Sequence, residues 1–96
     1  MLLVIDIGNT NMVFGVYQNN RLMHHFRLST HTHQTLDEYV VLLEHLLGRA
    51  NILPMQLDTG IIGSVVPSMT PLVEELCKVL FGFTPLVVGP GIKTGM

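Results

Sequence analysis

The stretch Leu-Leu-Val-Ile-Asp-Ile-Gly-Asn-Thr-Asn, residues 2–11, decides the fold of this 96-residue chain. Its first four residues are apolar, which is typical of a strand that is covered on both faces of a sheet. The run then reaches a carboxylate, Asp6, and a Gly-Asn-Thr-Asn sequence of turn-forming residues. We therefore expect a first strand over residues 2–7 that turns tightly into a second strand.

The residues that follow continue this strand into a meander. Apolar residues resume over residues 12–17, and an Asn-Asn turn comes next. Residues 21–29 then alternate, with every second side chain from Leu22 to Leu28 on one face. The pattern predicts three antiparallel strands in succession.

Two helices are expected further along the chain. Thr35 and Glu38 have the spacing of a capping box, in which each residue caps the other at a helix start. Apolar residues at helical spacing follow, and Gly48 is expected to end the helix in a left-handed conformation. The second helix is expected to have Pro71 at its first position and Gly82 at its end.

Apolar runs over residues 60–66 and 86–88 predict two more strands. The expected order is therefore β-β-β-α-β-α-β. Right-handed crossovers would assemble it into an α/β fold, a mixed sheet in which parallel strands continue the meander and helices pack against it.

Composition excludes several classes of protein. Hydrophobic residues make up 48% and charged residues only 12%, so the chain must bury a core, and its length allows one domain. No apolar run approaches the ~18 residues of a membrane span, and no secretory signal is expected. The net charge is −2 with scattered basic residues, which argues against nucleic-acid binding. The single cysteine, Cys77, excludes an internal disulfide and favours a cytoplasmic location.

The residues after the first strand could carry chemistry. Gly8 would let a ligand approach the backbone, and the amide groups of a tight turn can converge on phosphate oxygens. Asn9, Thr10 and Asn11 offer neutral donors, and Asp6 could hold Mg²⁺ directly or through water. The same residue types also form an ordinary hairpin turn capped by an Asx-type hydrogen bond. Both interpretations stay open from the residues alone.

Other polar residues point less clearly to a site. The histidines near His31 and His33 lack a cysteine or carboxylate at ligand spacing, so we expect them to be solvated. Ser64 has no histidine in a triad-like arrangement, which gives nucleophilic catalysis little support.

The stretch from Asp6 to Asn11 resembles the first phosphate motif of the superfamily of acetate kinase, sugar kinases, Hsp70 and actin, which implies a ribonuclease H-like (actin-like ATPase) half-domain. The whole chain is similar to the N-terminal portion of type III pantothenate kinase. Four segments in this order carry the similarity: the opening motif, Asp37-Glu38-Tyr39, Gly63-Ser64-Val65-Val66-Pro67 and residues 87–95. Gly63 departs from the family, where many members have Ser.

The resemblance implies ATP-dependent phosphorylation of pantothenate, the first step of coenzyme A biosynthesis, with Mg²⁺ and a monovalent cation, K⁺ or NH₄⁺. It also implies a homodimer of two-domain subunits with ATP in the cleft between the domains. Asp6 would be the metal-binding residue. The implied ATP-binding residues are Asp6, Ile7, Gly8, Asn9, Thr10, Asn11, Met12 and Val13.

The resemblance places this chain, residues 1–96, as a single N-terminal phosphate-binding domain. The catalytic Asp of the family, in a Gly-Ala-Asp-Arg segment, and the second lobe are expected beyond Met96, so no catalytic residue is assigned here. Two alternatives remain: a non-enzymatic nucleotide-binding or regulatory half-domain, and another small-molecule kinase of the superfamily. We expect a half-domain built to face a second lobe to expose apolar surface and to associate through it.

Overall fold

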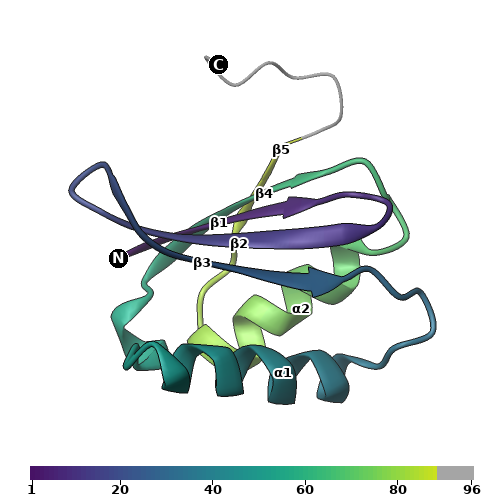
Figure 1. Cartoon of the computed structure of the whole chain (residues 1–96). Coiled ribbons are helices and arrows are strands. Elements are labelled where there is room, and N and C mark those ends of the chain that lie inside the picture. Colours follow the sequence, from purple (N-terminus) through teal and green to yellow (C-terminus); the bar gives the residue numbers. More distant parts are fainter. Residues whose placement is uncertain (89–96) are drawn as a thin grey trace.

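A computed structural model describes residues 1–88, so the expected connection over residues 89–95 lies outside the described part of the chain. Five strands, two α-helices and one short 3₁₀ helix follow each other in the expected order (Figure 1). The elements are β1 (Leu2–Ile7), β2 (Asn11–Gln18), β3 (Arg21–Ser29), α1 (Leu36–Arg49), η1 (Pro54–Gln56), β4 (Thr59–Ser64), α2 (Thr70–Phe81) and β5 (Leu86–Val88). The predicted α/β class is confirmed.

One mixed sheet organises the molecule, with its strands in the order β3-β2-β1-β4-β5. The first three strands form the predicted antiparallel meander. Strand β4 pairs in parallel with β1, and β5 pairs in parallel with β4. The opening stretch thus forms the central strand, paired on both sides.

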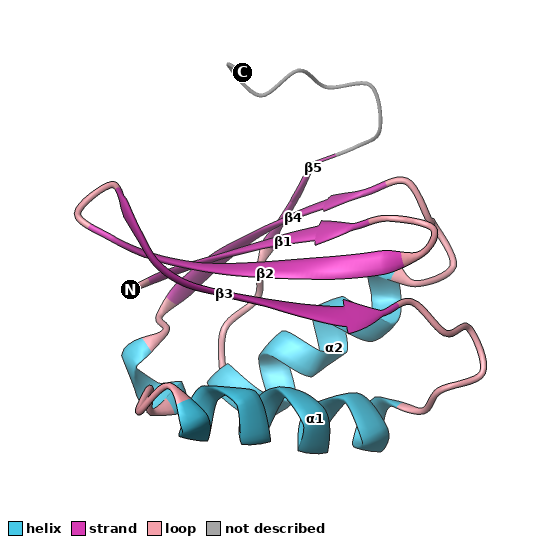
Figure 2. Cartoon of the chain, in the orientation of Figure 1, coloured by secondary structure: helices cyan, strands magenta, loops and turns pink. Residues whose placement is uncertain are grey.

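Both helices pack against the same face of the sheet (Figures 1 and 2). Alternation along β1 decides what they cover: Leu3, Ile5 and Ile7 are buried, whereas Asp6 is exposed and Val4 is half-buried on the opposite face. The core therefore lies between the sheet and the two helices. Its buried residues are Leu3, Ile5, Ile7, Met12, Phe14, Val16, Tyr39, Leu43, Leu47, Ile52, Leu57, Ile62, Met69, Val73, Leu76 and Cys77.

The predicted start of α1 is confirmed, but its predicted end is wrong. The Thr35 hydroxyl accepts a hydrogen bond from the Glu38 amide, and the Glu38 carboxylate accepts one from the Thr35 amide. The helix runs through Gly48 to Arg49, and the left-handed residue is Asn51, with φ 59°. A glycine is tolerated within a helix at a cost of about 1 kcal/mol, and here the next residues still find helical carbonyl partners.

Helix α2 ends as predicted. Gly82 adopts a left-handed conformation with φ 80°, and its amide donates to the carbonyl oxygens of Cys77 and Lys78. A residue with a side chain would be strained in this conformation. The chain then leads into β5 along the sheet edge.

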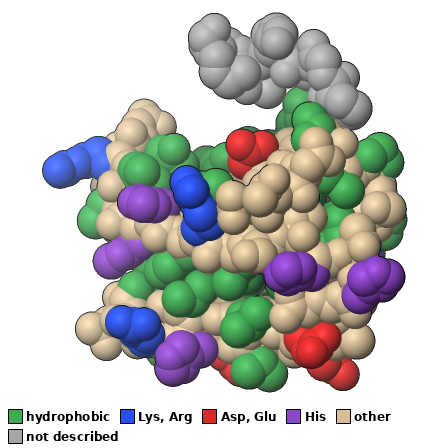
Figure 3. Space-filling view, turned by 45° about the vertical axis from the view of Figure 1, so that its right-hand side comes forward, with side chains coloured by type: hydrophobic (Ala, Val, Ile, Leu, Met, Phe, Trp, Pro, Cys, Tyr) green, Lys and Arg blue, Asp and Glu red, His purple; other side chains and the backbone are tan. Residues whose placement is uncertain are grey.

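Part of the apolar surface of the domain is exposed. Large hydrophobic side chains are exposed on both helices and on β5, and hydrophobic patches are visible in the space-filling view (Figure 3). Examples are Val41 on α1, Val79 on α2 and Leu86 on β5. In the same view, Lys and Arg side chains lie apart from one another. Within residues 1–88, neither helix is long and apolar enough to cross a membrane.

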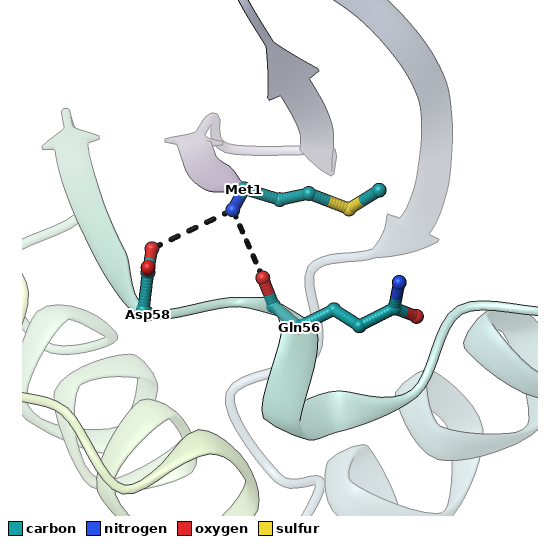
Figure 4. A network of polar contacts seen from close by, with 3 residues as sticks. All are labelled: Met1, Gln56 and Asp58. Atoms are coloured by element: carbon teal, nitrogen blue, oxygen red, sulfur yellow. Dashed lines mark hydrogen bonds and ion pairs between the residues drawn. The ribbon is translucent and has the colours of Figure 1, made fainter.

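The start of β1 is held by polar contacts with the segment before β4. The amino group of Met1 donates to the carbonyl oxygen of Gln56 over 2.9 Å and lies 3.5 Å from the Asp58 carboxylate (Figure 4). Asp58 is 77% exposed, so solvent weakens this ion pair. These contacts lie at the end of β1 opposite to Asp6 and the turn that follows it.

Candidate functional site

The main chain closes a tight turn between β1 and β2. The amide of Gly8 donates to the carbonyl oxygen of Asn11 over 2.9 Å. A Cβ atom at residue 8 would lie 3.1 Å from that same oxygen, which is tighter than an ordinary contact. Glycine at this position therefore allows the turn to close on itself.

The polar side chains of the turn do not close it. None of Asn9, Thr10 and Asn11 makes a side-chain hydrogen bond to another residue within the described range 1–88. Asn9 and Thr10 are exposed. The turn is therefore a hairpin turn closed by its main chain, without the Asx-type hydrogen bond of the alternative interpretation. The exposed side chains of Asn9 and Thr10 can contact a ligand or solvent.

Most carbonyl oxygens of the turn accept hydrogen bonds from inside the protein. The carbonyl of Ile7 accepts from the Val65 amide at 3.1 Å. The carbonyls of Gly8 and Thr10 accept from the hydroxyl and the amide of Thr30, each at 2.8 Å. A loop that binds anions must present N–H groups and keep carbonyl oxygens away, because the oxygens repel the anion. The turn meets the second condition.

Asp6 lies on the face of the sheet that the helices leave uncovered. It is exposed, and its register partners are Val13 on β2 and Gly63 on β4. A single accessible carboxylate suits Mg²⁺ that is held mainly by nucleotide phosphates, since this ion usually takes only one or two protein carboxylates. The donor set present at Asp6 therefore fits a metal carried by a nucleotide.

Two of the predicted ATP-binding residues are buried. Ile7 and Met12 have fully buried side chains in the core. They can contribute to a ligand site only through the main chain and by holding the turn in place. Val13 is half-buried beside Asp6, on the face that the helices leave uncovered.

A hollow of about 600 Å³ adjoins the turn at Asn9. Its other walls come from the segment between β3 and α1, from Glu38 and from Val66. The residues of that segment are Thr30, His31, Thr32, His33 and Gln34. Asp6 does not line the hollow. Sequence reasoning missed Thr30, because no local motif marks a residue that meets the turn from 22 positions away.

The remaining candidates have structural explanations. No three residues among His, Cys, Asp and Glu come together as a metal site in the part of the chain that the structure describes. The Ser64 hydroxyl accepts from the Val66 amide at 3.0 Å and donates to the Val66 carbonyl at 3.1 Å, which is a local turn. Cys77 is buried, and burial, together with Glu74, raises its thiol pKa to about 12. That thiol therefore stays protonated at neutral pH.

Comparisons with known proteins agree on one family. A family profile described as type III pantothenate kinase matches residues 2–96. The chain is 48% identical to a type III pantothenate kinase of Halalkalibacterium halodurans and 51% identical to those of Geotalea uraniireducens and Geobacter sulfurreducens. Each match covers all 96 residues of this chain and 38% of the relative. The chain thus spans little more than a third of the length of these relatives.

Two solved structures share the fold at low sequence identity. A Porphyromonas gingivalis protein described as an N-acetylglucosamine kinase matches with a TM-score of 0.65 and 16% identity, over 93% of this chain and 34% of that protein. The Thermus thermophilus RuvC structure matches with a TM-score of 0.53 and 18% identity, over 93% of this chain and 61% of that protein. The expected ribonuclease H-like, actin-like ATPase fold is confirmed.

Proposed function

Because the chain belongs to the type III pantothenate kinase family, we propose that it supplies the nucleotide-phosphate-binding part of an enzyme that phosphorylates pantothenate. The enzyme would transfer the γ-phosphoryl group of ATP to the pantothenate hydroxyl, which gives 4′-phosphopantothenate in the first step of coenzyme A biosynthesis. The observation that carries the proposal is the turn after β1, whose carbonyls at residues 7, 8 and 10 face protein donors.

The proposed phosphate site is the segment Asp6 to Val13. The turn's amide groups and the polar side chains of Asn9, Thr10 and Asn11 would bind the phosphate oxygens of ATP. Ile7 and Met12 would anchor the turn through their buried side chains. The site would thus combine a rigid base in the core with a polar, exposed tip.

Asp6 would hold Mg²⁺, directly or through a water molecule. When bound, Mg²⁺ neutralises charge on the β- and γ-phosphates during transfer. The exposure of Asp6 supports this role, since a nucleotide can reach its carboxylate on the uncovered face. The family resemblance also implies that the enzyme uses a monovalent cation, K⁺ or NH₄⁺. No described residue is assigned to bind this cation.

The transfer breaks the bond between the γ-phosphorus and the oxygen that bridges to the β-phosphate, and it forms a bond to the pantothenate hydroxyl oxygen. The hydroxyl proton must pass to a base. Asp6 is the only carboxylate in the segment Asp6 to Val13, and it is already assigned to the metal. Glu38, which lines the hollow at Asn9, accepts a hydrogen bond from the Thr35 amide in the capping box of α1. The base is therefore proposed to belong to a part of the enzyme outside residues 1–96.

The proposal extends to the assembly of the whole enzyme. Residues 1–96 would form one N-terminal phosphate-binding domain, completed by a second lobe and working as a cytoplasmic homodimer. Exposed apolar side chains on α1, α2 and β5 support an additional covering structure.

The alternatives differ in their reaction. A regulatory half-domain would bind ATP without transfer, and another kinase of the superfamily would phosphorylate a sugar or small acid instead. The test measures ADP release by the complete enzyme, including the proposed second lobe, with ATP and Mg²⁺, first with pantothenate and then with N-acetylglucosamine. Pantothenate-dependent release, with a product heavier by one phosphoryl group, is expected. Release only with the sugar, or with neither acceptor, would contradict the proposal.

The role of Asp6 needs a matched comparison. Asp6→Asn removes the negative charge of the side chain. We expect kcat to fall by at least about 100-fold, because Mg²⁺ would be held more weakly and would stabilise the charge of the transition state less. Asp58→Asn, at the opposite end of β1, makes the same change where no ligand is proposed and should leave kcat unchanged. Equal activity of the two variants would remove Asp6 from the site.

A further inference from the structure

Thr30 joins the end of β3 to the turn between β1 and β2 through two hydrogen bonds. Its hydroxyl donates to the carbonyl oxygen of Gly8 at 2.8 Å, and its amide donates to the carbonyl oxygen of Thr10 at 2.8 Å. One residue thus holds two carbonyls on either side of Asn9, the tip of the turn. Thr30 itself is half-buried.

The two bonds complete a pattern. Within residues 7–11, the carbonyl of Ile7 is held by the Val65 amide and that of Asn11 by the Gly8 amide. Thr30 holds the carbonyls of Gly8 and Thr10. A carbonyl released from such a bond can rotate toward a bound phosphate and repel it, with the neighbouring amide turning away.

The buried side chain of Tyr39, on helix α1, holds the main chain on both sides of Thr30. The Tyr39 hydroxyl donates to the carbonyl oxygen of Ser29 at 3.0 Å and accepts from the His31 amide at 2.9 Å. Its contacts therefore fall on the residues immediately before and after Thr30. The ring is fully buried in the core, so the hydroxyl has a rigid support.

We propose that Thr30, held by Tyr39, is a positioning residue that keeps the turn in its phosphate-binding form. The inference rests on the proposed function, since it gives Thr30 a part in ATP binding at that turn. Thr30 does not bind the nucleotide itself. It acts by directing two carbonyl oxygens away from the phosphates. The buried Tyr39, through its hydrogen bonds to Ser29 and His31, limits the movement of Thr30.

The test compares steady-state kinetics of the intact protein with those of Thr30→Val. This change keeps the shape of the side chain and the backbone amide but removes the hydroxyl that donates to the Gly8 carbonyl oxygen. We expect KM for ATP to rise about tenfold, which corresponds to the loss of one hydrogen bond. KM for pantothenate should stay within twofold. Thr30→Ser keeps the hydroxyl and should restore KM for ATP.

Two further variants separate positioning from general stability. Thr59→Val makes the same change on an exposed threonine of β4, at the far end of the sheet, and should leave both KM values unchanged. Tyr39→Phe keeps the buried ring and removes its hydroxyl. It should raise KM for ATP in the same direction by a smaller factor, and it provides the test if Thr30→Val does not fold.

An unchanged KM for ATP in Thr30→Val, or no rescue by Thr30→Ser, would overturn the inference. Equal rises in both KM values would also overturn it, because they indicate a general loss of structure. Asp6→Asn distinguishes this failure from failure of the proposed function. If Asp6→Asn impairs the enzyme and Thr30→Val does not, only the positioning role is wrong. If neither variant affects the use of ATP, both proposals are wrong.

Discussion

Asp6 and Gly63 lie directly opposite each other in the parallel pair of β1 and β4, and Asp6 is exposed on the face of the sheet opposite to the core. Apart from its chain neighbours, no atom of residues 1–88 lies within 4 Å of the place that a Cβ atom at Gly63 would take. The carboxylate therefore has open space on its β4 side. A serine hydroxyl at residue 63, which the family resemblance led us to expect, would lie next to the proposed metal-binding residue.

Replacement of that glycine should be well tolerated. Gly63→Ser is expected to leave the free energy of unfolding unchanged or to raise it by up to about 1 kcal/mol, since glycine in a strand interior is entropically unfavourable. Gly60→Ala in the same strand is the contrasting control. Its Cβ would lie 2.7 Å from the Phe83 ring and 3.1 Å from the Leu3 carbonyl oxygen, and it should cost about 1–3 kcal/mol. Urea unfolding measures both, and equal effects would contradict the packing described here.

The capping box of α1 should contribute measurably to stability. Thr35→Ala removes the hydroxyl that accepts from the Glu38 amide, and we expect a loss of about 1 kcal/mol. For a domain of this size that loss lowers Tm by about 4–8 °C. Thr32→Ala, in the exposed loop before the helix, is the control and should leave Tm unchanged. A Thr35→Ala protein as stable as the control would show that the cap contributes nothing.

The buried thiol of Cys77 should make stability fall at alkaline pH. Burial and Glu74 raise its pKa from 9.0 to about 12, so the folded state keeps a proton that the unfolded chain loses above pH 9. The stabilising contribution is complete below pH 9 and is lost as pH rises toward 12. The slope is at most about 1.4 kcal/mol per pH unit. Denaturant unfolding at pH 8 and pH 10.5 should show a smaller decrease for Cys77→Ala. Parallel pH profiles for the two proteins would rule out this thiol as the cause.

The ion pair between Met1 and Asp58 should matter little. Asp58→Asn is expected to change the free energy of unfolding by less than about 1 kcal/mol, because the carboxylate is exposed and screened by solvent. Thermal unfolding at low and high salt checks this expectation. The expectation would be contradicted if Asp58→Asn lowered the free energy of unfolding by more than about 1 kcal/mol and high salt lowered that of the unmodified protein by a similar amount.

Local patterns predicted the elements well, and the one helix end that they misplaced has a local cause too. The start of α1 at Thr35 depends on residues within one turn, so the sequence reveals it. Helix α1 ends at a local stop signal three residues after Gly48: Asn51 is left-handed, its amide donates to the Gly48 carbonyl, and the Ile52 amide donates to the Leu47 carbonyl. Asparagine can take the left-handed position at a helix end in place of glycine, and the prediction chose the wrong one of these two residues.

Local patterns reveal only part of the candidate site. Residues 6–11 stood out because a carboxylate and turn-forming residues follow a buried strand in a continuous stretch. The contribution of Thr30 could not be predicted, because it depends on the register that sets Asn11 opposite Ser29 across β2 and β3. Burial of Ile7 and Met12 follows from strand alternation, which also turns Asp6 to the opposite face.

The most direct test of the central claim is amide hydrogen exchange of the intact protein with and without ATP and Mg²⁺. The proposed phosphate site predicts slower exchange at residues 8–13 when the nucleotide is bound, and Asp6→Asn should reduce this protection. Protection by ATP elsewhere in the protein, with exchange at residues 8–13 unchanged, would contradict the claim that this turn binds the nucleotide phosphates.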